Sequence, residues 1–210
     1  IDSLTDSLGN DRLEIDSIEF FGPYFDEEDN RRLNLHLIRS WKTRAIMFNP
    51  DGQVRVPAEL LYKKNILVTR GSFKPFTKIN LDMMEQGMAQ FSQLPDVNAD
   101  NTLMLAEITL NQLVGDNEHI MDHDFVERVD QLSAMGYHVM ISDYVRYFRL
   151  RAYLRQFTQK QIGMVLGMVN LRRIFDEDFY RGVEGGILEG LGKMFPDNTI
   201  AYAYPEINDE

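Results

Sequence analysis

Residues 66–81 read ILVTRGSFKPFTKINL, and this stretch decides the fold that we predict for the chain. The run from residue 66 to 69 is largely apolar, which is typical of a strand buried on both faces of a sheet. A helical stripe follows, formed by Leu81, Met84, Met88 and Phe91. A strand, a loop and a helix in this order make one unit of an α/β fold.

The same unit recurs toward the C-terminus. Further strands are predicted over residues 103–108, 138–142, 162–166 and 199–204, with amphipathic helices between them, the last over residues 171–195 with a break at Gly185 and Gly186. Because these strands are apolar runs and do not alternate, we expect a mostly parallel sheet with helices on both faces, a Rossmann-like three-layer sandwich. A β/α barrel, or part of one, is the alternative.

The N-terminal part is patterned less regularly. We predict strands over residues 15–21 and 45–48, helices over 26–41 and 57–64, and a turn at 49–52. The chain begins at Ile1 within a pattern that already looks helical. We therefore expect one α/β domain over residues 1–210 that is a fragment of a longer protein, with residues 1–60 as a candidate subdomain.

Composition restricts the partners. The 210 residues include 22 Lys and Arg against 33 Asp and Glu, a formal net charge of −11. Such a surface repels duplex nucleic acid and anionic membranes, so neither is an expected partner.

The absence of cysteine excludes disulfides, thiolate metal sites and cysteine nucleophiles. No secretory signal and no apolar run of about 20 residues is present, so we expect a cytoplasmic protein.

Basic residues gather at two places on this acidic chain. The first group is Lys63, Lys64, Arg70, Lys74 and Lys78, and the second is Arg146, Arg149, Arg151 and Arg155. A locally basic site suits a small anionic ligand better than a polymer. Arg70, Gly71 and Ser72 follow a predicted strand, and Lys74 and Lys78 lead into a helix. At that position of an α/β sheet, we expect a phosphate or carboxylate to bind.

Two carboxylates lie near the ends of other predicted strands. If the sheet is parallel, Glu107 and Asp143 converge with Arg70 on one edge. They could then act as acid and base or bind a metal ion, with Arg146 and Arg149 close enough to meet an anion. The alternative is that each carboxylate pairs with a nearby arginine, or that Asp143 caps the next helix.

His119 and His123 are four residues apart, a spacing that can bind a transition metal on a helix. They lie at a predicted loop-to-helix junction, where Asp122 or Asp124 is better explained as a helix cap. We therefore assign no metal site. The sequence identifies no cofactor and no catalytic residue.

The stretch around residue 71 resembles the first motif of nicotinate or nicotinamide mononucleotide adenylyltransferases. Gly71, Phe73 and Pro75 match that motif, whereas Thr77 and Asn80 stand at its two histidine positions. Asn80 is neutral and cannot stabilise transition-state phosphates as an imidazolium does. The resemblance implies an enzyme-like phosphate loop with a degenerate motif.

A second resemblance covers most of the chain. Segments 57–64, 70–75, 124–130 and 185–192 are similar to the C-terminal half of a bacterial family of longer proteins, which are labelled either TonB-dependent receptor or mononucleotide adenylyltransferase. No catalytic residue is carried over from it.

Three functions remain open from the sequence. The first is binding of a nucleotide or phosphometabolite without catalysis, at the residues after the strand 66–69. The second is an assembly module, pairing with a second copy or with other domains of a longer chain. The third is nucleotidyl transfer with a degenerate motif.

Overall fold

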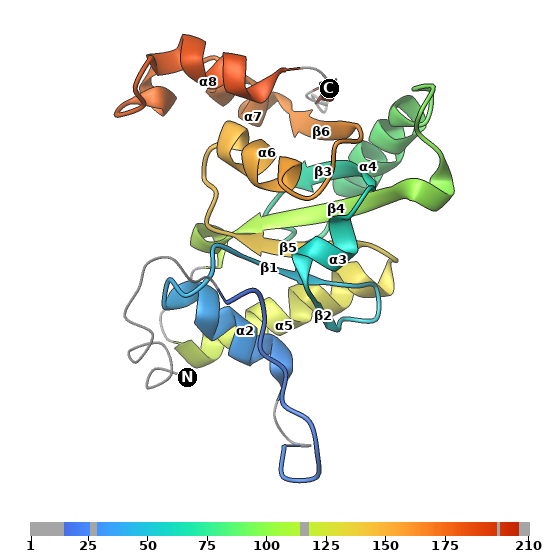
Figure 1. Ribbon diagram of the computed structural model, residues 1–210, viewed down its shortest axis with the longest axis vertical. Helices are drawn as coiled ribbons and strands as arrows, with labels where there is room; N and C mark the ends of the chain where they lie inside the picture. The colour runs from blue at the N-terminus through green and yellow to red at the C-terminus, as the bar shows by residue number, and fades with distance from the viewer. Residues whose placement is uncertain (1–14, 26–28, 114–117, 197, 206–210) are drawn as a thin grey trace.

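The computed structural model describes residues 15–25, 29–113, 118–196 and 198–205, and only the backbone of residues 118–121. Within these residues one sheet has the order β2-β1-β5-β4-β3-β6-β7. Its strands are β1 (Ala45–Phe48), β2 (Val54–Arg55), β3 (Asn65–Arg70), β4 (Thr102–Thr109), β5 (His138–Ser142), β6 (Ile162–Gly167) and β7 (Thr199–Tyr204). The mostly parallel three-layer architecture is confirmed (Figure 1).

Strand direction and order define the topology. Strands β3 to β7 are parallel, while β1 runs antiparallel to β5 and β2 antiparallel to β1. The sheet is open, with β2 and β7 at its edges, so the barrel alternative is wrong. From β3 the chain builds outward through β4 and β5, and then crosses back to place β6 on the other side of β3. Ligands bind at the carboxyl ends of the strands where such a reversal occurs.

Helices cover both faces. The first face is covered by α3 (Pro57–Leu61), α6 (Tyr147–Arg155), α7 (Met168–Ile174) and α8 (Gly186–Met194), which pack on one apolar cluster. The second face is covered by α2 (Asn30–Arg39), α4 (Lys78–Phe91) and α5 (Glu118–Ala134). Short 3-10 helices η1 (Ala99–Asn101), η2 (Leu110–Gln112) and η3 (Glu177–Tyr180) complete the connections. Among the described residues, no helix is long and apolar enough to cross a membrane.

Strand pleating decides which face each side chain meets. In β3, Ile66 and Val68 belong to the core of the first face, and Leu67 belongs to the core of the second. Arg70 continues the even-numbered series and therefore extends toward the first face, at the carboxyl end of the strand. In β4 the same rule places Glu107 on the first face with Leu103 and Leu105.

Two glycines let α4 lie close to the sheet. A Cβ atom on Gly163 of β6 would lie 2.7 Å from Cδ1 of Leu67 and 2.9 Å from Cδ2 of Phe91. A Cβ atom on Gly87 of α4 would overlap the side chain of Val165. Side chains at either position would push the helix away from β3 and β6.

The structure corrects several predicted elements. Residues 15–21 form no strand and instead lie extended beside α2. Helix α5 begins at Glu118, so the caps predicted at Asp122 and Asp124 are wrong. Both residues lie inside the helix, where Asp122 pairs with Arg39 of α2 and Asp124 pairs with Arg128. The helical region predicted over residues 171–195 consists of α7, η3 and α8. Residues 26–28 of the first predicted helix lie outside the described part, and α2 begins after Asp29, whose carboxylate accepts the Arg31 N–H.

Candidate functional site at the carboxyl edge of the sheet

A buried ion pair joins the ends of β3 and β4. Arg70 and Glu107 are register partners, and Nε of Arg70 lies 2.5 Å from Oε2 of Glu107. A second bond runs from Nη2 of Arg70 to Oε1 of Glu107 at 3.2 Å. The hydroxyl of Ser142, at the end of β5, donates to the same Oε1 at 2.5 Å. Both carboxylate oxygens are therefore engaged, which leaves Glu107 poorly placed to act as a general base.

Arg70 is held in place by further hydrogen bonds and by a contact with an aromatic ring. Its Nη1 donates to the carbonyl of Val145 at 2.7 Å, and its Nη2 donates to the carbonyl of Tyr144 at 2.6 Å. Its guanidinium lies 4.4 Å from the ring centroid of Tyr147. Four of its five N–H groups are thus used within the described residues, and one on Nη1 remains. Arg70 holds the β5–α6 loop against the sheet.

A small hollow of about 100 Å³ opens beside Arg70, at the carboxyl ends of β3 and β4 and next to the starts of α6 and α7. We call it the edge hollow. It is lined by Arg70, Thr109, Asn111, Gln112, Val145, Tyr147, Asn170, Arg173 and Phe179. These residues come from four successive connections of the sheet, which is the usual composition of a ligand site in a doubly wound fold.

Tyr147 contributes an unusual group to the edge hollow. Its side chain is only 4% exposed, yet its hydroxyl has no hydrogen-bond partner among the described residues. Burial raises the pKa of this hydroxyl far above its ordinary value; Arg70 and Arg173 oppose that rise and Glu107 adds to it. The hydroxyl therefore stays protonated at every physiological pH and is a permanent donor. An acceptor oxygen is the partner that it lacks.

Arg173 gives the edge hollow its net positive charge. This residue lies in α7 with its guanidinium 5.4 Å from the ring centroid of Phe179, and no described carboxylate pairs with it. The charge of Arg70, by contrast, is balanced by Glu107. The edge hollow thus combines one uncompensated cation with a neutral donor, which favours a small anion.

The other predicted loop residues lie away from the edge hollow. Gly71 donates its N–H to the carbonyl of Glu107, and the carbonyl of Ser72 accepts from Arg128. Nζ of Lys74 lies 2.6 Å from Oδ1 of Asp124 on α5, so it faces the second side of the sheet. Lys78 is exposed at the start of α4.

The start of α4 is closed by its own side chains. Asn80 accepts from the backbone N–H of Thr77 at 2.9 Å, and the hydroxyl of Thr77 accepts from the N–H of Asn80 at 3.3 Å. These are the two residues that the sequence comparison set against the histidines of the adenylyltransferase motif. Here they form a capping box, which satisfies the helix terminus without a phosphate.

The predicted residues after β5 also separate. Asp143 pairs with Arg44 at 2.6 Å, outside the Arg70–Glu107 network. Arg146 donates to the carbonyls of Phe179 at 3.0 Å and Arg181 at 2.7 Å, which fixes η3 beside the start of α6. Arg149 is exposed on α6 and does not line the edge hollow. The structure brings Arg70 and Glu107 together and leaves Asp143 and Arg149 apart from them.

Sequence reasoning identified only Arg70 among the nine residues that line the edge hollow. Tyr147, Asn170, Arg173 and Phe179 are among the eight residues to which the sequence assigned no binding role. A signal was available for two of them, because Asn170 and Arg173 lie in the helix that directly follows β6 at the predicted carboxyl edge. The unbonded Tyr147 hydroxyl could not be predicted, since it depends on the packing around α6.

Of the two histidines with metal-binding spacing, His119 and His123, the structure describes the side chain of His123 alone. His123 is exposed and lies 3.5 Å from Glu127, whereas the side chain of His119 lies outside the described part. Among the described side chains, no group of three or more His, Asp or Glu residues could hold a metal ion. Comparison of the chain with protein-family models, with curated proteins and with solved structures finds no match.

Proposed function

We propose that this domain binds a small anionic metabolite, such as a nucleotide or a sugar phosphate, and holds its phosphoryl or carboxylate group in the edge hollow. The observation that carries the proposal is the buried Tyr147 hydroxyl without a partner beside two guanidinium groups. A buried donor left unsatisfied costs about 1–3 kcal/mol. An anionic oxygen would remove that cost and be attracted to Arg173.

Each donor has a defined role in this arrangement. The Tyr147 hydroxyl and the remaining N–H on Nη1 of Arg70 supply short hydrogen bonds. Arg173 supplies the charge, and the Asn170 amide supplies a further donor on α7. Glu107 and Ser142 do not touch the anion; they hold Arg70 in place. No catalytic residue is assigned.

The size of the edge hollow limits what it encloses. Its volume is about 100 Å³. Whole drug-sized ligands occupy pockets of roughly 300–1,000 Å³. The hollow therefore accepts only the charged end of a metabolite, and the remainder lies outside it. The reversal of strand order at β3 supports a ligand at this position.

Thermal unfolding with and without added anions tests the proposal. Inorganic phosphate, AMP, ATP and ribose 5-phosphate are titrated against the protein, and binding is then measured by calorimetry. A ligand present at 100 times its Kd should stabilise the fold by about 2.7 kcal/mol.

Tyr147→Phe removes the hydroxyl while keeping the ring, and should weaken binding roughly 10-fold or more, the equivalent of one charge-assisted hydrogen bond. The matched control is Tyr62→Phe, because Tyr62 is exposed after α3 and should bind as the wild type does. The proposal fails if no anion stabilises the wild type, or if both variants bind equally.

A further inference from the structure

A second feature of the molecule is independent of the edge hollow: an extended N-terminal segment held beside α2. The N–H of Phe20 donates to Oδ1 of Asn30 at 2.8 Å, and Nδ2 of Asn30 donates to the carbonyl of Phe20 at 3.2 Å. Asn34 makes the same pair of bonds with Ile18, at 3.1 Å and 2.7 Å. Alternate residues of an extended segment thus meet asparagines one helical turn apart.

This double clamp positions a turn rich in aromatic side chains. Residues 20–25, which we call the aromatic tip, contain Phe20, Phe21, Tyr24 and Phe25. Phe21 is 76% exposed and Tyr24 is 95% exposed, while the rings of Phe20 and Phe25 stack at 4.9 Å. The N–H of Phe25 donates to the carbonyl of Gly22 at 2.8 Å and closes the turn. An ordered, exposed group of aromatic rings is typical of an interaction surface.

A larger hollow of about 700 Å³ lies directly beside the aromatic tip. We call it the N-terminal hollow, and it is lined by Glu19, Phe21, Asp29, Asn30, Arg31, Gly52, Gln53, Val54 and Arg55. Its volume falls in the range that accommodates a drug-sized ligand, so it has room for two aromatic side chains.

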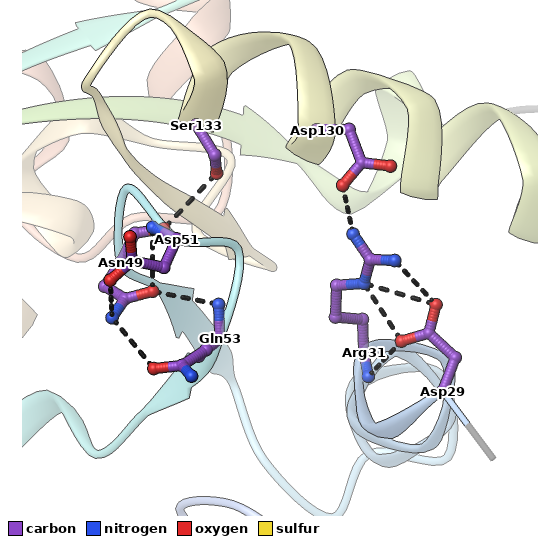
Figure 2. Close-up of polar contacts among 7 residues, drawn as sticks. All are labelled: Asp29, Arg31, Asn49, Asp51, Gln53, Asp130 and Ser133. Atoms are coloured by element: carbon purple, nitrogen blue, oxygen red, sulfur yellow. Dashed lines mark hydrogen bonds and ion pairs between the residues drawn. The ribbon is translucent and has the colours of Figure 1, made fainter. Parts of the chain in front are cut away.

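The walls of the N-terminal hollow are fixed by polar contacts (Figure 2). Arg31 forms ion pairs with Asp29, the capping residue just before α2, and with Asp130 on α5. On the opposite wall, Oδ1 of Asn49 accepts from the N–H of Gln53 at 2.9 Å and from the N–H of Asp51 at 3.1 Å. Ser133 of α5 donates to the carbonyl of Asn49. The hollow is therefore preformed, which lowers the entropic cost of filling it.

We propose that the aromatic tip of one copy packs into the N-terminal hollow of a second copy, and that the two copies exchange tips around a two-fold axis. Phe21 belongs to both the tip and the lining of the hollow, so the two features form one continuous patch. A patch that carries a projection and a matching recess side by side is self-complementary, as a two-fold interface requires. Arg55 in the lining offers a cation to the ring face of Phe21 or Tyr24 from the other copy.

Sedimentation velocity over a concentration series tests the association. A standard interface buries about 800 Å² per partner, and the tip contributes only residues 20–25, so we expect a dimer that dissociates on dilution. The double variant Phe21→Ser with Tyr24→Ser should sediment as a monomer at every concentration. Its far-ultraviolet circular dichroism and melting temperature should match the wild type, because both rings are exposed.

A matched control removes apolar surface elsewhere. Val169→Ser with Leu188→Ser changes two similarly exposed residues of α7 and α8 and should leave the dimer intact. A benzoylphenylalanine at position 24 should crosslink to Gln53 or Arg55 of another copy. A wild type that is monomeric throughout, a dimer that survives the tip variant, or a crosslink only to a different protein would each overturn the proposal.

Discussion

Two charged networks flank the sheet at its carboxyl edge, and they are built differently. On the first face, Arg70 and Glu107 form a buried pair beside a hollow in which the Tyr147 hydroxyl has no partner. On the second face, Asp124 binds both Arg128 and Lys74, and Arg128 also donates to the carbonyls of Ser72 and Gln112. The second network fastens the loop between β3 and α4 to α5.

The difference shows how one basic stretch serves two purposes. Arg70 and Lys74 are four residues apart in the sequence, but β3 ends between them and the chain turns toward the second face. One cation lines a candidate ligand site, and the other fastens a loop to a helix. Three predictions test this division, beginning with the largest expected effect.

Glu107→Ala should cost about 3–5 kcal/mol of unfolding free energy, because it leaves Arg70 buried without its counter-charge. Urea denaturation followed by circular dichroism measures the change as a lower midpoint with an unchanged slope. Glu189→Ala is the control, since Glu189 pairs with Lys193 on the exposed side of α8 and should matter by less than about 0.5 kcal/mol. A Glu107 variant as stable as the control would show that the buried pair is not a structural anchor.

Asp124→Asn should cost about 2 kcal/mol near neutral pH, since it removes charge-assisted bonds from Arg128 and Lys74. Burial alone would raise the pKa of Asp124, but the bonds from Arg128 and Lys74 outweigh it and hold the pKa below its ordinary value. A lowered pKa in the folded state stabilises the fold above the ordinary pKa, and this contribution is lost as the pH falls through the folded value.

The difference in stability between the wild type and Asp124→Asn should therefore shrink below about pH 4. Urea titrations at several pH values measure it. Glu127→Gln on the same helix provides the comparison, because Glu127 is exposed and pairs with the exposed His123. A difference that stays constant down to pH 2 would contradict the assigned role of the ion pairs.

Tyr147→Phe should have the smallest effect on the free protein, which keeps the stability of the wild type or gains about 1 kcal/mol. The reason is that the lost hydroxyl has no partner among the described residues. Thermal unfolding without added anion measures this. A clear loss of stability would mean that the hydroxyl is bonded in the free protein, and the two networks would then not differ in the way described.

Much of the fold could be predicted from the pattern of apolar runs. The strands at residues 45–48, 138–142 and 199–204 are found at the predicted bounds. The segment at residues 15–21 was mistaken for a strand because its bonds go to the side chains of Asn30 and Asn34, which no backbone pattern reveals. The start of α5 was placed too late because Asp122 and Asp124 look like caps, whereas Arg39 and Arg128 recruit them as ion-pair partners.

The sequence by itself determined the alternation of strands and helices, the mostly parallel character of the sheet and the position of Arg70 at a strand end, because burial on both faces imposes continuous apolar runs. Only the tertiary structure decided that Arg70 meets Glu107, that Lys74 meets Asp124, and that Tyr147 has no partner. Those outcomes depend on the order of strands and on the face to which each side chain points. Both are set by contacts between residues far apart in the chain, and local patterns do not encode them.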